Sequence, residues 1–369
     1  MADKFDVLAK LQIRNNVLLI GAPGTGKSRL MNEVAEEFLT ARQQVDAPAH
    51  IPGAAIPIPA EVETPIMRRL PFLQLTNKQV FRTTFHQNTK YRDLLTGIIP
   101  QIGGTNEGYC VSQGILYRAN EFAKRPDSAS LVIIDEINRG PAVEAFGGSI
   151  AALEPDKRLA EDGSVLPTTQ SFEIISPIDG TALDYAFSPR LYILAAMNQA
   201  DVSVAPLDVA FLRRWASISL EPDYDTLRAY FGIGANIPLP EIPTNPSEVY
   251  FAAIQALQRI NDKISVGRGE EYRLGHGIFM SIRRPQIDDL ASALDFCVQV
   301  WDAIITHVEE LFFGNALSIG YVINASDPRS PYSIEEANFA EDIRAILRKP
   351  TVSATNIYSV LISAGERNA

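Results

Sequence analysis

Gly21-Ala22-Pro23-Gly24-Thr25-Gly26-Lys27-Ser28 is the stretch that decides the fold of this chain. It fits the pattern G-x-x-x-x-G-K-[ST], and it stands after an apolar run at 17–20 and before a segment of helical periodicity at 28–40. Glycines let successive backbone N–H groups face a phosphate with no side chain in the way. We therefore expect a phosphate-binding loop made by Gly21, Pro23, Gly24, Thr25, Gly26, Lys27 and Ser28.

Side chains of catalytic type follow this loop and a second apolar run. Lys27 would bring a positive charge to the β- and γ-phosphate oxygens, and the Ser28 hydroxyl is a ligand type that suits Mg²⁺. The run at 131–134 is an apolar strand that delivers Asp135 and Glu136 at its carboxyl end, where ligands gather in open α/β sheets. We expect Ser28 and Asp135 to hold the metal ion and Glu136 to orient or deprotonate an attacking water.

The order of apolar and helical segments predicts an α/β fold. Strand-like runs recur at 80–85, 191–196 and 217–220, and a helix is expected at 112–124, so residues 1–221 should form a doubly wound parallel sheet with helices. Closely spaced prolines at about 45–72 predict an exposed insertion. From 222 to 369 the periodicity is helical, at 249–260, 287–313 and 334–347, which predicts a helical lid and C-terminal helices.

Composition limits the classes of protein to which the chain can belong. A formal net charge of -11 disfavours a broad nucleic-acid-binding surface, so any DNA contact should be local or supplied by a partner. The two cysteines, Cys110 and Cys297, lie outside any zinc-binding or disulfide pattern. The sequence has no signal peptide and no apolar stretch of bilayer length, which predicts a cytoplasmic protein.

Several further motifs resemble the McrB family, the AAA+ motors of modification-dependent restriction systems. The resemblance extends from residue 15 to about 315 and is carried, in order, by 84–88 (TFHQN), 91–93, 97–100, 134–140 (IDEINRG), 146–147, 154–158 (EPDKR), 196–201 (AMNQAD), 207–214 (LDVAFLRR), 274–280 (LGHGIFM) and 300–314. It implies a P-loop AAA+ core with a helical lid, self-association into a ring, commonly a hexamer, and a bound nucleotide with Mg²⁺. The fold favours ATP, while the best-known McrB branch prefers GTP, so the base remains open.

The resemblance also implies roles for residues beyond the loop and the two acids. Asn198 would be the polar sensor at a strand end, near the γ-phosphate and the attacking water; the alternative is an asparagine that forms a turn. Arg213 and Arg214 would reach the γ-phosphate of a neighbouring subunit as arginine fingers, and the alternative is a favourable charge at a helix end. The catalytic set expected from the sequence is thus Glu136, Asn198, Arg213 and Arg214.

This chain also departs from the family. Val202 stands where relatives commonly have a basic residue, and no lid arginine is assigned as a sensor, with Arg273, Arg283 and Arg284 as candidates by location. His276 and His86 remain ambiguous between nucleotide contact and packing. McrB-type proteins usually carry a DNA-reading domain before the motor, and because the first strand is expected near residue 17 we expect a motor domain without one.

Two functions follow from this comparison, and a third remains open. The first is a ring-forming motor that couples ATP or GTP hydrolysis to DNA translocation or remodelling with a McrC-like nuclease, in a restriction or anti-phage defence complex. The alternative is a MoxR-like remodelling chaperone that acts on protein clients and shares the same motifs. A nucleotide-gated switch without mechanical output is disfavoured by Glu136, which a protein that only binds nucleotide would not need.

Overall fold

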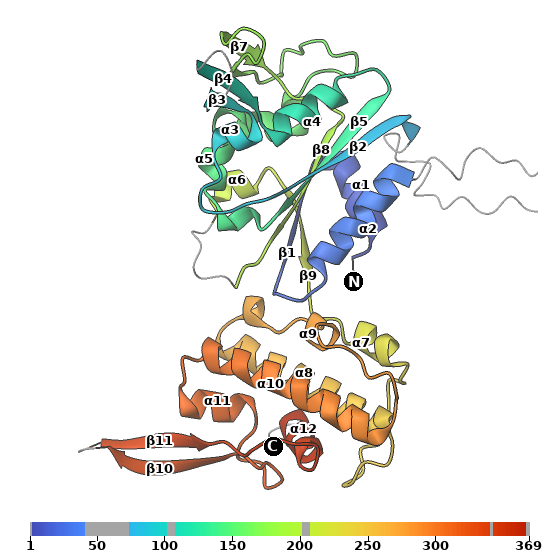
Figure 1. Ribbon diagram of the computed structural model, residues 1–369, viewed down its shortest axis with the longest axis vertical. Helices are drawn as coiled ribbons and strands as arrows, with labels where there is room; N and C mark the ends of the chain where they lie inside the picture. The colour runs from blue at the N-terminus through green and yellow to red at the C-terminus, as the bar shows by residue number, and fades with distance from the viewer. Residues whose placement is uncertain (1, 41–73, 102–107, 201–206, 340–341, 367–369) are drawn as a thin grey trace, which may run out of the picture. The chain divides into compact units, whose positions relative to one another are not determined.

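A computed structural model describes residues 2–40, 74–101, 108–200, 207–339 and 342–366 of the chain. Contacts divide the chain into two compact units, whose elements are labelled in Figure 1. One unit comprises Met1–Ile20 with Lys27–Leu220, and the other comprises Gly21–Gly26 with Glu221–Ala369. The proline-rich insertion expected at 45–72 and the residue Val202 lie outside the described residues.

A five-stranded sheet is the centre of the first unit. The strands β2 (Asn77–Thr84), β5 (Ser128–Asp135), β8 (Leu191–Met197), β1 (Asn16–Gly21) and β9 (Ala216–Leu220) lie in that order across it. The pairs β2–β5, β5–β8 and β8–β1 are parallel, and every residue of β8 is buried. Apolar strands covered on both faces are what a parallel sheet requires, so the predicted α/β fold is confirmed.

Helices cover both faces of this sheet. On one face, α1 (Lys4–Arg14) and α2 (Lys27–Thr40) bury Leu8, Val34 and Phe38 against β1, β5 and β8. On the other face, α4 (Ile115–Ala123), α5 (Ala142–Phe146) and α6 (Val209–Leu212) pack around a cluster of aromatic rings that includes Phe146 and Trp215. Two separate apolar clusters therefore fix the sheet from either side.

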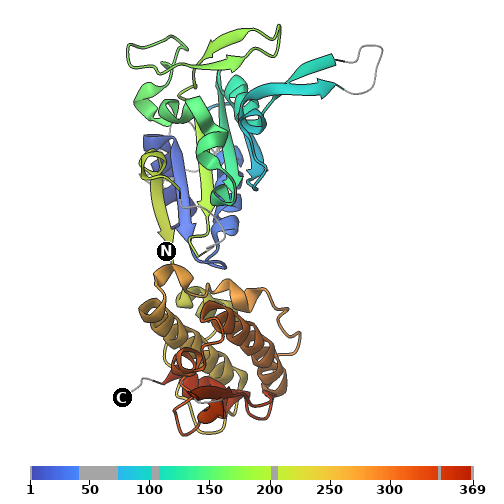
Figure 2. The ribbon, with the colours of Figure 1, turned by 90° about the vertical axis from the view of Figure 1, so that its left-hand side faces the viewer.

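Two hairpins extend from the first unit (Figure 2). One pairs β3 (Thr96–Gln101) with β4 (Gly108–Gln113), and the other pairs β6 (Phe172–Ile175) with β7 (Ala182–Tyr185). The helix expected at 112–124 was placed too early, because Ser112 belongs to β4 and α4 begins at Ile115. Gly114 separates the two elements: a Cβ there would lie 2.3 Å from the carbonyl carbon of Leu94, so the chain needs glycine at this close approach.

Helices form most of the second unit. Its elements are α7 (Tyr224–Phe231), α8 (Pro246–Gly267), α9 (Gly277–Met280), α10 (Leu290–Leu311), α11 (Ala316–Val322) and α12 (Ile357–Gly365). Asn245 caps α8 by accepting from the Glu248 N–H, and Asp289 caps α10 in the same way. The buried Trp301 donates its indole N–H to the Tyr332 hydroxyl at 2.8 Å. Among the described helices, none is both long and apolar enough to cross a membrane.

The helix expected at 334–347 is wrong, because this segment forms a hairpin of β10 (Ser333–Phe339) and β11 (Asp342–Arg348). Along β11 the burial alternates near its end, with Ala345 and Leu347 half-buried between exposed neighbours. That period of two is typical of a strand with one covered face. The guanidinium of Arg348 contacts the carboxylate of Glu335 across the pair at 2.8 Å. The isoleucines and leucine of this short segment fit a helix nearly as well, which explains the error.

The Arg158 side chain is buried and donates several hydrogen bonds near the start of β1. It is 1% exposed, and burial lowers its pKa to about 9. Its guanidinium donates to the Asn16 side-chain oxygen at 2.9 Å and to the backbone carbonyls of Leu153, Ser188 and Leu191. Asn16 in turn donates to the carbonyls of Leu153 and Arg214. Arg158 thus fixes the first residue of β1 to the chain segments around it.

Replacing Arg158 with methionine should lower the free energy of unfolding by about 3–5 kcal/mol, because several buried acceptors lose their donor at once. Urea unfolding followed by circular dichroism measures this change. Arg348→Met is the matched control, since Arg348 is 61% exposed in its pair with Glu335, and it should cost less than about 1 kcal/mol. Equal stabilities for the two variants would contradict the role given to Arg158.

Candidate active site

The phosphate-binding loop joins β1 to α2. The backbone at Gly24 and Gly26 has φ of 77° and 88°, a left-handed conformation that favours glycine. Thr25 is 1% exposed, and its hydroxyl donates to the Ala22 carbonyl at 2.9 Å, which closes the turn from inside. The loop that the sequence predicted therefore has a backbone shape that depends on two of its glycines.

Lys27 is the first residue of α2 and is 8% exposed. Burial lowers its pKa to about 8, although the negative charges of Glu136 and Asp135 act in the opposite direction. The ammonium group therefore lies in a poorly hydrated position with both acids near enough to affect it. Such a site favours an additional anion, because a phosphate would replace the water that the lysine has lost.

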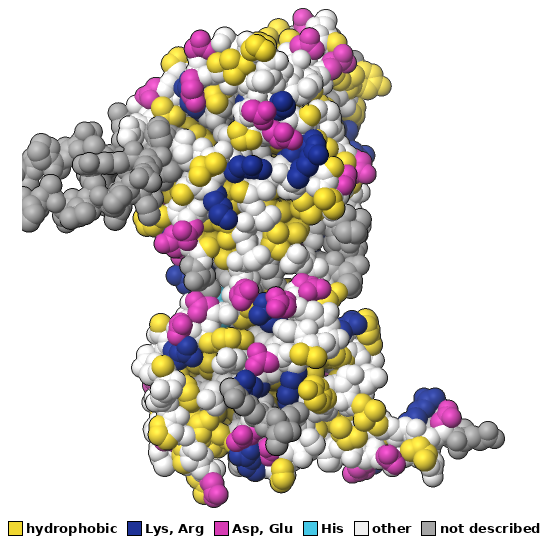
Figure 3. Space-filling model, turned by 180° about the vertical axis from the view of Figure 1, so that it is seen from behind, with side chains coloured by type: hydrophobic (Ala, Val, Ile, Leu, Met, Phe, Trp, Pro, Cys, Tyr) yellow, Lys and Arg dark blue, Asp and Glu magenta, His cyan; other side chains and the backbone are white. Residues whose placement is uncertain are grey.

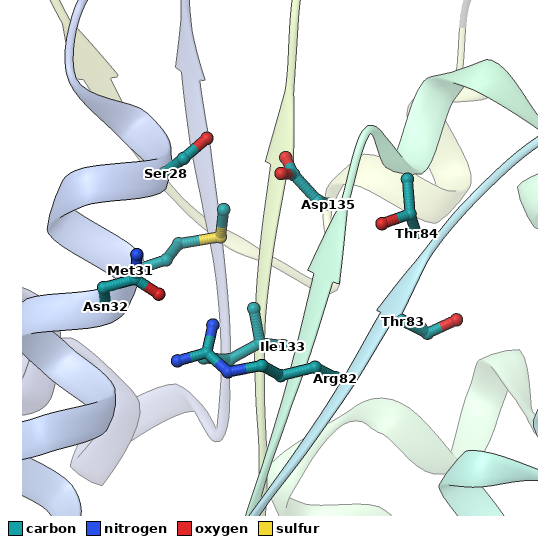
Figure 4. Close-up of a pocket in the computed structure, with 8 residues that line it drawn as sticks. All are labelled: Ser28, Met31, Asn32, Arg82, Thr83, Thr84, Ile133 and Asp135. Atoms are coloured by element: carbon teal, nitrogen blue, oxygen red, sulfur yellow. The ribbon is translucent and has the colours of Figure 1, made fainter.

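Asp135 ends β5 opposite Thr84 of β2, and the carboxylate accepts from the N–H of Glu136 at 3.1 Å. Beside it is a cavity of about 430 Å³ lined by Ser28, Met31, Asn32, Arg82, Thr83, Thr84, Ile133 and Asp135. Figure 4 shows the Ser28 hydroxyl and the Asp135 carboxylate pointing toward each other across this space. A hydroxyl and a carboxylate are ligands that suit Mg²⁺, which usually takes its remaining ligands from water and phosphate. These two residues therefore fit the metal predicted for them.

Glu136 follows Asp135 in a left-handed backbone conformation, with φ of 53°, which is uncommon for a residue other than glycine. Its carboxylate accepts from the Asn198 side-chain amide at 2.6 Å, and Arg139 contacts its other oxygen at 3.4 Å. Asn138 donates to the Asn198 carbonyl at 2.8 Å. The structure therefore brings the two polar residues predicted from separate strands, Glu136 and Asn198, into direct contact.

Asn138 and Arg139 belong to this site, although the sequence analysis gave them no role. Both stand in the run 135–139, directly after the paired acids. They lie in the short turn Ile137–Arg139, where Asn138 is 7% exposed while Arg139 is half exposed. Their position within the run was the available signal, but the hydrogen bond between Asn138 and the backbone of Asn198 depends on the pairing of β5 with β8.

Arg213 and Arg214 have different surroundings. The Arg214 side chain is 11% exposed, contacts the Glu154 carboxylate at 3.4 Å and donates to the Ala210 carbonyl. Arg213 is exposed, and within the described residues its guanidinium makes no hydrogen bond or ion pair. Of these two arginines, Arg213 is the one whose guanidinium has no partner among the described residues and is available to another molecule. The two residues lie at the end of α6, just before β9.

Other residues considered as nucleotide contacts, His86, Arg273 and Arg284, each have partners within the chain. His86 follows β2 and accepts from the Asn88 N–H at 3.2 Å, so it shapes a turn. Arg284 donates to the Tyr230 carbonyl at 2.7 Å and packs over the Tyr230 ring, and Arg273 contacts Glu221 at 3.7 Å. Both arginines thus have partners within the second unit. Among the described residues no group of three or more His, Cys, Asp or Glu is placed to hold a metal ion.

Comparison with known proteins adds independent information. Residues 66–215 match the model of the AAA domain (dynein-related subfamily). The EcoKMcrB subunit of a type IV methyl-directed restriction enzyme from Escherichia coli K12 is 29% identical over 282 residues, which are 74% of this chain and 49% of that protein. The YdiS component of the type II restriction enzyme BsuMI from Bacillus subtilis 168 is 30% identical over 228 residues, covering 59% of this chain and 60% of that protein. This chain thus spans only about half to three fifths of the length of these relatives.

Among solved structures, PCH-2 from C. elegans aligns with a TM-score of 0.33 and 14% identity, over 81% of this chain and 67% of that chain. The family assignment therefore depends on the matched domain model and on the two restriction-system relatives.

The pKa of about 8 for Lys27 predicts a pH dependence of nucleotide binding. As the pH rises through this value the ammonium loses its proton, and the attraction to phosphate is lost with it. The Kd for ATP with Mg²⁺ should increase by up to about tenfold per pH unit above the pKa of Lys27, as measured by fluorescence titration with a labelled nucleotide.

Lys27→Arg is the control, because arginine stays protonated over this range. Its affinity, though weaker, should be the same at about pH 7 and about pH 9. Equal wild-type affinities at the two pH values would contradict the lowered pKa of Lys27.

Proposed function

Because this chain is a McrB-like AAA+ protein, related to the McrB and YdiS subunits of restriction systems, we propose that it hydrolyses ATP or GTP as the motor of a restriction or anti-phage defence complex. The contact of 2.6 Å between Asn198 and Glu136, next to Asp135 and Lys27, is the observation that carries this proposal. A protein that only binds nucleotide needs the loop but not a carboxylate fixed beside it. Hydrolysis needs both.

Each residue then has a defined task in one turnover. The N–H groups of the loop and the Lys27 ammonium would bind the phosphates, and Ser28 and Asp135 would hold Mg²⁺, which when bound would supply positive charge to the phosphate oxygens. Glu136 orients the attacking water and accepts its proton. Asn198 holds the Glu136 carboxylate in place through its amide. Asn198 and Glu136 come from neighbouring strands, so the distance between them is set by the sheet.

We assign the trans-acting role to Arg213 of the pair predicted from the sequence. Its exposed guanidinium has no partner among the described residues, whereas the guanidinium of Arg214 is held by Glu154 and Ala210 within the same subunit. An arginine that acts on a neighbour must be free to leave its own subunit. Activity should therefore require self-association, and a ring is the arrangement in which every site receives an arginine.

We propose that DNA is engaged through the assembled complex and a nuclease subunit. The net charge of the chain is -11, and on the face shown in Figure 3 acidic and basic side chains are interspersed over both units. Phosphate-backbone binding depends on an excess of positive charge, which the net charge of this chain disfavours. Both relatives are parts of restriction enzymes, which supports a partner that cuts DNA.

Purification of the chain with its native partners tests this proposal, with ATP and GTP turnover then measured with and without DNA. Co-purification of a nuclease and stimulation of turnover by DNA are expected. A partner with a von Willebrand A-type domain, together with turnover that DNA does not change, would overturn the restriction role and favour remodelling of protein clients.

Glu136→Gln should abolish most hydrolysis while nucleotide binding is retained, because the amide cannot accept a proton from water. A reduction of about 10²–10⁴-fold in kcat is expected from the loss of a general base. Glu144→Gln is a matched control, since Glu144 is an exposed acid on α5 of the same unit, and its kcat should equal that of the wild type. If the Glu136→Gln variant hydrolysed nucleotide at the wild-type rate, the role of Glu136 as the general base would be contradicted.

Arg213→Ala should reduce kcat by about 10³-fold or more without loss of nucleotide binding or stability, as expected of an arginine finger. A mixture of Arg213→Ala and Lys27→Ala subunits should recover activity, because each Arg213→Ala site receives an arginine from its Lys27→Ala neighbour. Arg214→Ala should instead lower the melting temperature, as should Glu154→Gln, because both remove the same contact. Full activity of Arg213→Ala in a monomeric sample would contradict the trans role.

A further inference from the structure

The segment Gly275-His276-Gly277 packs on the phosphate-binding loop within the second unit. The N–H of Gly275 donates to the Pro23 carbonyl at 3.1 Å, and the N–H of Gly277 donates to the Gly24 carbonyl at 2.8 Å. A Cβ on Gly275 would lie 2.1 Å from the Gly24 carbonyl carbon, and one on Gly277 would lie 2.8 Å from the Gly24 oxygen. Only glycines allow the two backbones to approach this closely, so the contact requires glycine at both positions.

His276, between these glycines, has a defined orientation and is 5% exposed. Its Nδ1 accepts the backbone N–H of Asp223 at 3.1 Å. A neutral imidazole with Nδ1 as acceptor carries its proton on Nε2. The Nε2 edge of the ring lies against the phosphate-binding loop, 3.7 Å from the place where a Cβ on Gly26 would be. The His276 ring therefore faces the loop at Gly26 with one edge and accepts the backbone N–H of Asp223 with the other.

Asp223 is the cap of α7, the first helix of the second unit. Its carboxylate accepts from the N–H groups of Asp225 and Thr226 at 2.9 and 3.2 Å. Two residues earlier, Glu221 contacts Arg273 at 3.7 Å. The chain directly after β9 is thus joined to the segment 273–276 at two points. Of these two contacts, the one through His276 also reaches the phosphate-binding loop.

We propose that His276 is a positioning residue that links nucleotide binding at the loop to the start of α7. The proposal rests on the nucleotide site proposed above and names the side chain through which the second unit responds to it. A nucleotide that reorders Gly24–Gly26 changes the surface on which the imidazole packs, and the ring passes that change to the Asp223 N–H through one hydrogen bond. By linkage, a restraint on α7 changes nucleotide affinity by the same factor.

Two substitutions separate the two ends of this link. His276→Asn keeps an acceptor near the position of Nδ1 but is too short to reach Gly26. His276→Gln carries an amide toward the position of Nε2 but leaves the Asp223 N–H without its acceptor. The measurement is hydrogen–deuterium exchange of residues 221–231 in the full chain, with and without ATP and Mg²⁺ and with and without GTP and Mg²⁺. His307→Gln is the matched control, because His307 lies on α10 of the same unit.

In the wild type and in His307→Gln, nucleotide should slow exchange in 221–231 by about fivefold or more, the lower range for coupled sites. In both His276 variants this difference should vanish while nucleotide still binds. A role in stability alone would speed exchange equally with and without nucleotide and leave the difference intact, which would overturn the proposal. Absence of nucleotide binding by the wild type, with Lys27→Ala as the reference, would instead refute the proposed site itself.

Discussion

Parallel pairing of β1, β8 and β5 is the constraint on which the site depends. Because the three strands run in the same direction, their carboxyl ends meet at one edge of the sheet, and each end delivers a functional group. β1 leads into the phosphate-binding loop, β5 ends in Asp135 and Glu136, and β8 is followed by Asn198. The register places Ile20 opposite Met197 and Ile134 opposite Ala195. A shift of one residue between β5 and β8 would separate the amide of Asn198 from the carboxylate of Glu136, and a shift between β1 and β8 would move the phosphate-binding loop away from both.

Much of this arrangement could be predicted because it is local in the sequence. An apolar strand followed by a glycine-rich loop has one common three-dimensional form, so the phosphate-binding loop, the two acids and the α/β fold follow from short stretches of residues. The resemblance to the McrB family added Asn198 and the two arginines. Relatives from restriction systems agree with that resemblance.

What could not be predicted depends on contacts between distant segments. Arg213 and Arg214 are identical in type and adjacent, so only the position of Glu154, some sixty residues away, separates an exposed arginine from an internally paired one. Nothing in the sequence distinguishes Arg158 from an exposed arginine, and its burial follows from four acceptors, three of them on distant segments. The hairpin at 333–348 was mistaken for a helix because its apolar residues fit both periods, and cross-strand partners decided between them.

Hydrogen bonds at the start of β1 join this strand to the segment that carries Arg213 and Arg214. The carbonyl of Arg213 accepts from Arg14, and the carbonyl of Arg214 accepts from Asn16, where β1 begins. At its far end the same strand becomes the phosphate-binding loop. β1 therefore connects the segment that carries the exposed arginine to the phosphate-binding loop, over a strand about 20 Å long. In the ring proposed above, a force applied to Arg213 would reach the loop through the side-chain hydrogen bonds of Arg14 and Asn16 and then along one strand.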